Sequence, residues 1–281
     1  MSPAPSPSGP SRPGTAVVTG ASSGIGAAYA EHLAAAGHDL VLVARRAHRL
    51  EPLARELSAA GAQVEVLVAD LADAGDRAAV AERAARPDVA LLVNNAGING
   101  YGPFDGVDPV VLARVVELNV TAPTLLARAA LPGMRERGRG AVVNVASLLA
   151  LAGSLPPDPL PARAVYAGTK GYLVTFTRTL AAELAGTGVS AQVVCPGYTA
   201  TEFHLGSGTE PVAEGAADVV GHSAAAMPAE DVVLASLAAL ATGEVVCVPG
   251  LADPAAVQAL VDAELGVRSG SGPALAPRYH A

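Results

Sequence analysis

The sequence predicts an α/β fold: a doubly wound sheet of about seven mostly parallel strands with helices on both faces. Short apolar runs rich in valine alternate with longer stretches of helical periodicity, an order that favours parallel strands joined by helical crossovers. A glycine-rich turn joins the first apolar run to the first helical stretch. No internal repeat or shift in composition divides the chain, so we expect one domain over residues 14–265, with a disordered arm (1–13) before it and a loose tail (266–281) after it.

Strands and helices are expected to follow one another in regular alternation. β-Branched apolar runs predict strands at 16–18, 39–44, 63–69, 89–93, 141–146, 189–194 and 244–248. Helical periodicity predicts helices at 27–36, 50–60, 76–85, 109–131, 166–184, 230–242 and 253–265. Gly37 and Gly61 follow two of these helices and are typical stop signals. Residues 202–226 are rich in Gly, Ala and Ser, which suits a mobile lid over a pocket.

Composition argues against several kinds of partner. The formal charge of −8 disfavours nucleic acid, whose binding needs a basic patch. Cys195 and Cys247 lie in apolar runs and are too few for a disulfide framework or a zinc site, so we expect buried thiols, no metal and a reducing cytoplasm. No apolar run reaches the roughly 18 residues of a membrane helix, and residues 1–13 lack the apolar core of a secretory signal. We therefore expect a cytoplasmic protein that binds neither nucleic acid nor membrane.

The glycine-rich turn has the spacing G-x-x-x-G-x-G. Thr19-Gly20-Ala21-Ser22-Ser23-Gly24-Ile25-Gly26 stands between a predicted strand and a predicted helix. Glycines let the backbone approach a phosphate and let the helix pack closely on the strand, while the helix N-terminus attracts negative charge. Such a cluster can also be a plain turn. In this context it favours dinucleotide binding, with contacts expected from Gly20, Ser22, Ser23, Gly24, Ile25 and Gly26.

Two arginines follow the second predicted strand. An acidic residue at this place would bind the adenosine ribose 2′-hydroxyl of NAD(H), but Arg45 and Arg46 stand there. A guanidinium matches phosphate in charge and in fork geometry. The pair therefore predicts NADP(H) in preference to NAD(H), with two solvated arginines as the alternative.

Polar residues also follow the next three predicted strands. Asp70 can cap the next turn or hydrogen-bond an adenine amine. The amides of Asn94-Asn95-Ala96-Gly97 can bridge strands or contact a ribose, with a simple Asx turn as the alternative. Asn119 lies in an apolar helical segment, so its amide needs a buried partner or lines a site. Ser147 follows the fifth strand.

Tyr166-Ala-Gly-Thr-Lys170 places a phenol and an amine four residues apart, on one face of the predicted helix. A free tyrosine has a pKa of about 10 and is a poor proton carrier at neutral pH. An ammonium beside it would favour the phenolate and lower that pKa. The pair is therefore a candidate acid/base for proton transfer to or from a carbonyl or alcohol, and an exposed helix face is the alternative.

In order and spacing, these motifs resemble those of the short-chain dehydrogenase/reductase family over about residues 15–250. The resemblance rests on the glycine turn, Asn94-Asn95-Ala96-Gly97, Tyr166-x-x-x-Lys170 and Pro196-Gly197. It implies a Rossmann-type fold and a nicotinamide-dependent oxidoreductase that acts on the CH–OH group of a small substrate. It also implies a homodimer or homotetramer formed through long helices such as 110–131 and 166–184.

The resemblance assigns a role to each matching residue. Tyr166 would be the general acid/base, and Lys170 would lower its pKa and bind the nicotinamide ribose. Ser147 would hold the substrate carbonyl oxygen, and Asn119 would anchor a water that relays protons from Lys170. The cofactor would also contact, at the nicotinamide end, Pro196, Gly197, Thr199 and Thr201; at the ribose, Asn94, Asn95, Ala96 and Gly97; and at the adenosine end, Arg45, Arg46, Asp70 and Leu71.

Three features depart from the family pattern. Ser147 and Tyr166 are 19 positions apart rather than roughly a dozen, so a proline-rich insert should reshape the pocket mouth and leaves Ser154 as a second candidate serine. Ser23 stands where some NADP-using members carry a basic residue. Gly168 interrupts the helix that carries Tyr166, and since glycine costs about 1 kcal/mol there, we expect tight packing around it.

The leading functional hypothesis is carbonyl reduction with NADPH. A second is non-redox chemistry, such as dehydration, isomerisation or cyclisation, with the same tyrosine and serine, because a fold does not dictate a reaction. A third, a non-catalytic cofactor sensor, is disfavoured because all four catalytic residue types are present. Consumption of reduced nicotinamide during turnover distinguishes the first from the second. Substrate identity and the physiological direction lie beyond the sequence.

Overall fold

The computed structural model describes residues 13–158, 160–205 and 226–279. The chain separates into two units, Met1–Pro249 and Gly250–Ala281, whereas the sequence predicts one domain to residue 265. In the second unit, α8 (Ala255–Ser269) extends into the stretch expected to be a loose tail, and each of its residues is at least partly exposed. The predicted N-terminal arm, except residue 13, and residues 206–225 of the predicted lid lie outside the described residues.

The first unit contains a seven-stranded sheet in the order β3-β2-β1-β4-β5-β6-β7, with parallel pairing between all neighbours. This confirms the predicted doubly wound, Rossmann-type sheet. β7 is shorter than expected, because only its two residues continue the ladder beside Val193 and Val194. The strands are β1 (Thr15–Thr19), β2 (Asp39–Ala44), β3 (Val64–Val68), β4 (Val89–Asn94), β5 (Gly140–Val145), β6 (Val189–Val194) and β7 (Val246–Cys247).

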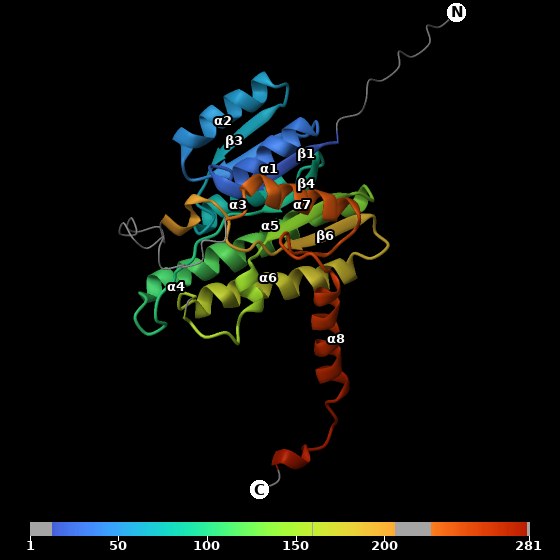
Figure 1. Cartoon of the computed structure of the whole chain (residues 1–281). Helices are drawn as coiled ribbons and strands as arrows, with labels where there is room; N and C mark the ends of the chain where they lie inside the picture. Colours follow the sequence, from blue (N-terminus) through green and yellow to red (C-terminus); the bar gives the residue numbers. More distant parts are fainter. Residues whose placement is uncertain (1–12, 159, 206–225, 280–281) are drawn as a thin grey trace, which may run out of the picture. The chain divides into compact units, whose positions relative to one another are not determined.

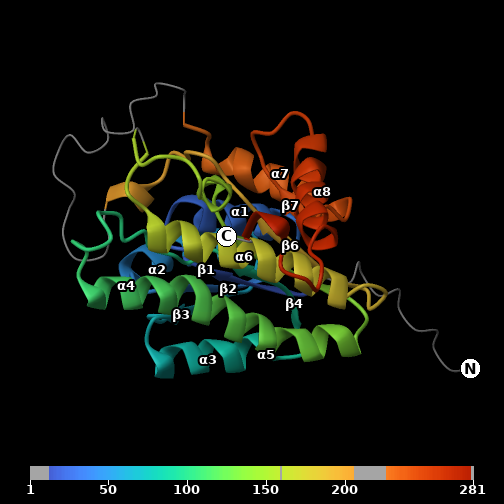
Figure 2. The same ribbon diagram turned by 90° about the horizontal axis from the view of Figure 1, so that it is seen from below.

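Helices cover both faces of the sheet (Figures 1 and 2). Because side chains alternate along a strand, Ala16 and Val18 of β1 face one core while Val17 faces the other. The first core is covered by α1 (Gly24–Ala35), α2 (Ala47–Ala59) and α7 (Ala229–Ala241). The second is covered by α3 (Ala74–Ala84), α4 (Pro109–Val116), α5 (Ala122–Glu136) and α6 (Ala164–Glu183).

The long helical stretch predicted at 109–131 is interrupted. A π-helix, Glu117–Thr121, lies between α4 and α5 and contains Asn119. The whole stretch, Pro109–Glu136, has 28 residues and contains an 18-residue window with a mean hydropathy of 1.5, so by length and composition it could span a membrane. The expectation that no stretch is long enough therefore does not hold. Core helices pass the same test, and Leu126 and Met134 of α5 are fully buried in the second core.

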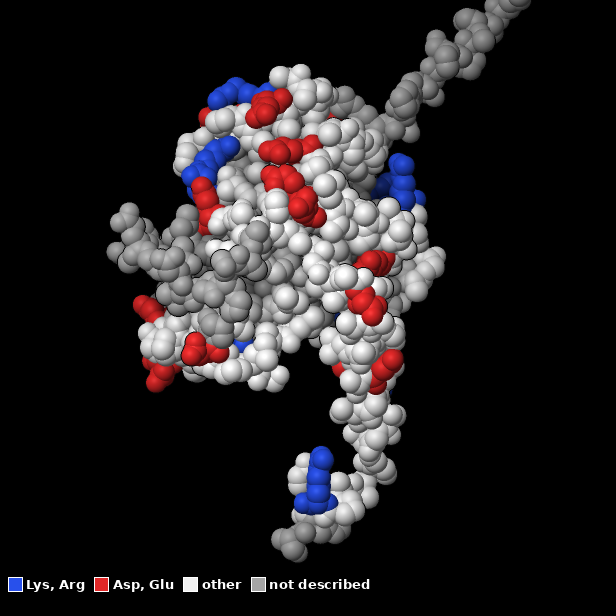
Figure 3. All heavy atoms as spheres, in the orientation of Figure 1, with Lys and Arg blue, Asp and Glu red and all other residues white. Residues whose placement is uncertain are grey.

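Acidic side chains gather on the face formed by α1 and α7 (Figure 3). Partial burial raises the pKa of Glu31 on α1, and the nearby carboxylates of Glu230 and Glu56 raise it further.

The order of the strands reverses beside β1, whose neighbours are β2 on one side and β4 on the other. In such sheets the loops that follow the two diverging strands leave a crevice at the carboxyl edge. The glycine turn follows β1, and Asn95-Ala96-Gly97 follows β4. The topology therefore brings the two motifs to the same crevice.

We predict that Gly168→Ala stabilises the protein. The expectation of tight packing around Gly168 is wrong, because a Cβ placed there meets no heavy atom within 4 Å. Alanine should therefore add roughly 0.5–1 kcal/mol to the free energy of unfolding, since glycine is the poorer helix former. Urea denaturation measures the change. Gly26→Ala is the matched contrast and should destabilise, because its Cβ would lie 2.3 Å from the Gly20 carbonyl oxygen.

Candidate active site

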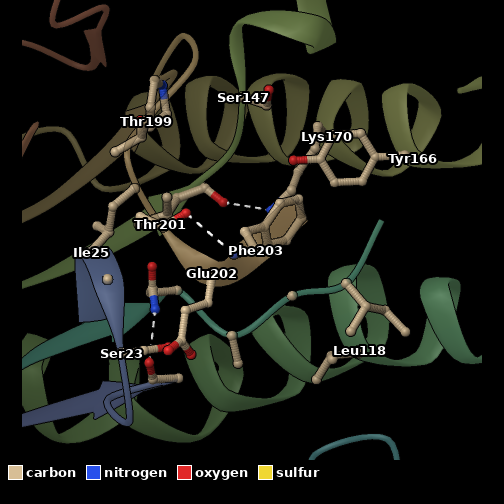
Figure 4. Close-up of a pocket in the computed structure, with 18 of the residues that line it drawn as sticks. Ser23, Ile25, Leu118, Ser147, Tyr166, Lys170, Thr199, Thr201, Glu202 and Phe203 are labelled. Atoms are coloured by element: carbon tan, nitrogen blue, oxygen red, sulfur yellow. Dashed lines mark hydrogen bonds between the residues drawn. The ribbon is translucent and has the colours of Figure 1, made fainter. Parts of the chain in front are cut away.

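A cavity of about 920 Å³ lies at the carboxyl edge of the sheet, lined by residues from the loops after β1 to β6. Figure 4 shows Tyr166, Lys170 and Ser147 on one side of it and Ser23 of the glycine turn on the other. Of the residues expected from the sequence to form the site, all line this cavity except Gly26, Asn94 and Asn119.

The three exceptions support the site from behind. Gly26 lies against the carbonyl oxygen of Gly20 and allows α1 to pack on the turn. Asn94 differs from its expected cofactor contact: its amide donates to Asn144 Oδ1 at 2.9 Å and so ties β4 to β5 in the sheet. A strand-end asparagine can face the ligand or the neighbouring strand, and its position within the β4–β5 ladder selects the strand.

Hydrogen bonds fix the glycine turn to the loop after β4. Thr19 Oγ1 accepts from the backbone nitrogens of Asn95, at 2.9 Å, and Ala96, at 3.1 Å. In return, Asn95 Nδ2 donates to the carbonyl oxygen of Thr19 at 3.0 Å. Gly20 has a φ of 68°, and a Cβ there would lie 2.7 Å from Asn95 Nδ2. The contact therefore requires glycine, and it holds the turn open towards the N-terminus of α1.

Arginine side chains gather at the end of β2. Arg46 donates to Ser22 Oγ at 2.8 Å and to Ser23 Oγ at 2.7 Å, which ties it to the glycine turn. Arg45 lies 3.9 Å from Asp70, which also accepts a hydrogen bond from Arg114. Sequence reasoning missed Arg49, which lines the cavity one helical turn beyond Arg46. The i, i+3 spacing on α2 is the signal that could have found it.

Tyr166 is 5% exposed and lies between two aromatic rings. Tyr101 meets it edge-on with ring centroids 5.3 Å apart, and Phe203 is tilted against it at 5.7 Å. Burial raises the pKa of Tyr166, Tyr101 raises it further, and a hydrogen bond with Ser147 opposes the rise. The sequence predicts that Lys170 lowers the pKa of Tyr166. In the structure the pKa of Tyr166 rises instead, because desolvation of the phenolate is the largest effect.

Lys170 is buried beneath this tyrosine. Its Nζ donates to the carbonyl oxygen of Val145 at 2.8 Å and lies 5.7 Å from the centroid of the Tyr166 ring. Burial lowers the pKa of Lys170 to about 8. A Cβ on Gly97 would lie 3.4 Å from this Nζ and 3.2 Å from Asn119 Oδ1, so glycine leaves room for both groups.

Asn119 is held by the π-helix against the loop after β4. Its Oδ1 accepts from the Ile98 nitrogen at 3.0 Å, and its Nδ2 donates to the Ile98 carbonyl oxygen at 2.9 Å and to Thr169 Oγ1 at 3.1 Å. The side chain thus joins α6 to this loop one residue away from Lys170. A π-bulge of this kind is frequent at functional sites.

Ser147 is the serine at the site. It follows β5 and lines the cavity, and its Oγ accepts from the Leu149 nitrogen at 3.2 Å. Its hydroxyl also opposes the rise in the pKa of Tyr166. Ser154, the alternative left open by the unusual spacing, does not line the cavity. Among the described residues no group of three or more His, Cys, Asp or Glu side chains could hold a metal ion.

A family model described as short chain dehydrogenase matches residues 14–210. The chain belongs to the short chain dehydrogenase family. A short chain dehydrogenase of Pseudocercospora fijiensis is 40% identical to it over 193 residues, which cover 67% of this chain and 60% of that relative. The enzyme class expected from the sequence, a short-chain oxidoreductase acting on a CH–OH group, is thereby confirmed at the level of the family.

Solved structures of other short chain dehydrogenases extend the likeness over nearly the whole chain. A short-chain dehydrogenase from Sphingobium yanoikuyae in complex with NADPH is 36% identical, with a TM-score of 0.85 over 95% of this chain and 100% of that one. The bulky-bulky ketone specific alcohol dehydrogenase from Comamonas testosteroni is 32% identical, with a TM-score of 0.82 over 95% and 99%. A short chain dehydrogenase/reductase from Burkholderia phymatum in complex with NAD, 26% identical with a TM-score of 0.74, also matches.

The insert that separates Ser147 from Tyr166 in this short chain dehydrogenase is fastened by a buried arginine. Arg163 is 7% exposed and donates to the carbonyl oxygens of Ala152 at 2.9 Å, Leu155 at 3.0 Å and Pro161 at 3.1 Å. It thereby holds the insert over the cavity, where the insert contributes an apolar wall of Leu148, Leu149, Ala152, Leu155, Leu160 and Pro161.

We predict that the buried amine makes stability depend on pH. The folded pKa of Lys170, about 8, lies below its usual 10.5, so between these values the unfolded chain binds the proton and the folded chain does not. Stability then rises with pH. Between pH 8 and pH 10 the free energy of unfolding of the wild type should rise by on the order of 2 kcal/mol more than that of Lys170→Met, in which the amine is absent.

Urea unfolding of both proteins without cofactor measures this difference, and the other titrating groups cancel. A direct readout is also available, because Lys170 is the only lysine in the sequence. Protein labelled with ¹³C-lysine should show a single titrating side-chain resonance. A midpoint above pH 10 for that resonance would contradict the prediction.

Proposed function

We propose that this short chain dehydrogenase reduces the carbonyl group of a small organic substrate with bulky apolar substituents, using NADPH. The proposal rests chiefly on the convergence of Tyr166, Ser147 and Lys170 at one end of a cavity whose other end carries the glycine turn and the arginines. The apolar insert wall, with Tyr101 and Phe203 beside Tyr166, favours an apolar substrate. The structural similarity to the bulky-bulky ketone specific alcohol dehydrogenase from Comamonas testosteroni supports the same substrate class.

The cavity fits a nicotinamide dinucleotide. Gly20 and Gly97 keep backbone accessible where side chains would otherwise fill the space, and the helix N-terminus at Gly24 suits a pyrophosphate. Arg45 and Arg46 suit a ribose phosphate. Thr199, Thr201 and Lys170 would hold the nicotinamide half. When bound, the cofactor supplies the hydride, and the protein supplies orientation and charge.

The proton chemistry falls to Tyr166. The phenol carries its proton at neutral pH, and burial raises its pKa and makes it a weaker acid than a free tyrosine. Donation to a carbonyl oxygen, as negative charge develops there, therefore depends on groups that stabilise the phenolate. Ser147 supplies a second hydrogen bond to that oxygen. The charge on Lys170 then stabilises the phenolate that remains. A protonated phenol suits reduction, whereas oxidation of an alcohol would require the phenolate.

The proposal also includes a cytoplasmic location and assembly into a homo-oligomer. The buried free thiols of Cys195 and Cys247 suit the reducing cytoplasm. Assembly as a homodimer or homotetramer through the long helices is supported by exposed apolar side chains on or beside them, namely Val116, Leu125 and Tyr172.

Tyr166→Phe should lower the turnover of a diaryl ketone with NADPH by at least about 100-fold, because the proton donor is lost. The affinity for NADPH should change little. Stopped assays of alcohol formation and the loss of reduced-nicotinamide absorbance measure turnover, and calorimetric titration measures the affinity for NADPH. Normal turnover by the variant would refute the assignment. Product formation by the wild type without cofactor consumption would instead support dehydration, isomerisation or cyclisation.

Arg46→Ala should weaken NADPH binding about tenfold and leave NADH binding nearly unchanged, because only NADPH carries the phosphate that the guanidinium would bind. Calorimetric titration of both cofactors measures the two affinities, and Arg45→Ala should show whether the second arginine shares the role. Arg135→Ala, at the exposed C-terminal end of α5, is the control for loss of one positive charge. Equal loss for both cofactors would argue against NADP(H) preference.

A further inference from the structure

Glu202 occupies the arginine cluster at the adenosine end of the cavity. It begins a short 3-10 helix, Glu202–Leu205, that follows β6 and Thr201. Its carboxylate accepts hydrogen bonds from Arg46 NH1 at 3.0 Å and from Arg49 NH1 at 2.7 Å and 2.8 Å. Figure 4 shows the side chain reaching from this segment towards Ser23 of the glycine turn.

The segment that carries Glu202 lies directly over the turn. A Cβ on Gly24 would be 2.8 Å from Thr201 Cγ2, so Thr201 covers the first residue of α1. Arg46 is held at the same place by Ser22 and Ser23. Two guanidiniums therefore hold the carboxylate beside the turn, in a cluster whose three side chains are 39% to 41% exposed.

This arrangement has the chemistry of an anion site that already contains an anion. A carboxylate and a phosphate use the same N–H donors of a guanidinium, and the phosphate carries more charge. The hydrogen bonds from Arg49 and Arg46 lower the pKa of Glu202, which keeps the carboxylate charged at neutral pH. A ribose phosphate can take these donors only if the carboxylate leaves them, and otherwise the two anions repel.

We propose that Glu202 is a specificity-determining residue whose carboxylate competes with the 2′-phosphate of NADPH for Arg46 and Arg49. The inference rests on the proposed use of a nicotinamide dinucleotide. NADH has a hydroxyl at that position and leaves the ion pairs in place. NADPH must displace the carboxylate, so Glu202 reduces the NADPH preference that the arginines alone would produce.

The test compares Glu202→Gln with the wild type by calorimetric titration. Loss of the carboxylate should tighten binding of NADPH and of adenosine 2′,5′-bisphosphate about five- to tenfold, as expected for one charge near an exposed phosphate site. Binding of NADH and ADP should change less than about twofold, because neither contacts the freed guanidiniums. Glu136→Gln, an exposed carboxylate before the amino end of β5, is the control for net charge and should change none of the four affinities.

Three outcomes would overturn the proposal. One is NADPH affinity that does not rise in Glu202→Gln. Another is an equal rise for NADPH and NADH, which would place the action of Glu202 at the pyrophosphate common to both. The third is a gain that persists when Arg46→Ala and Arg49→Ala are both added, since the freed guanidiniums are its cause.

These outcomes are separable from failure of the proposed function. A wild type that binds neither dinucleotide overturns both proposals. In a further outcome, the wild type binds NADH more tightly than NADPH, while Glu202→Gln shifts the preference towards NADPH. That result refutes the proposed preference for NADP(H) and supports the role of Glu202.

Discussion

The close approach of β1 and β4 at the carboxyl edge of the sheet is the constraint on which the site depends. Thr19 and Asn95 exchange hydrogen bonds there, and Gly20 and Gly26 lie so close to neighbouring atoms that a Cβ on either would collide. Because a parallel sheet aligns the ends of its strands, this contact sets where the loops after β5 and β6 can reach. The phenol, the amine and the arginines take their positions around it.

The two ends of the cavity differ in how far their charged and titratable side chains are buried. Near Tyr166 the apolar rings and the buried position disfavour both the phenolate and the ammonium, so the tyrosine pKa rises and the lysine pKa falls. Around Arg45, Arg46 and Arg49 the charges are exposed and paired. The first end holds the groups that we propose to move a proton, and the second holds those that we propose to recognise a phosphate.

Most of the architecture could be predicted because it is encoded locally. Valine runs, glycine stops and helical periodicity identify all seven strands and the helices that cover them, within a few residues at most ends. The misses arise where neighbours override the local pattern. β7 has two residues because only Val246 and Cys247 pair with β6. The long predicted helix contains a π-helix around Asn119, whose side chain accepts a hydrogen bond from the loop after β4.

The sequence by itself determined the local motifs. The glycine turn, the Tyr166–Lys170 spacing and Arg45-Arg46 each lie within one turn or one helix, and they predict a dinucleotide, a proton carrier and a phosphate. Only the tertiary structure decided how the groups are tuned. The direction of the Tyr166 pKa shift, the partner of Asn94, the clamp of Arg163 on the insert and the pairing of Glu202 with Arg46 and Arg49 all depend on residues brought together by folding. Desolvation and long-range pairing are properties of the packed chain, so local residue patterns do not specify them.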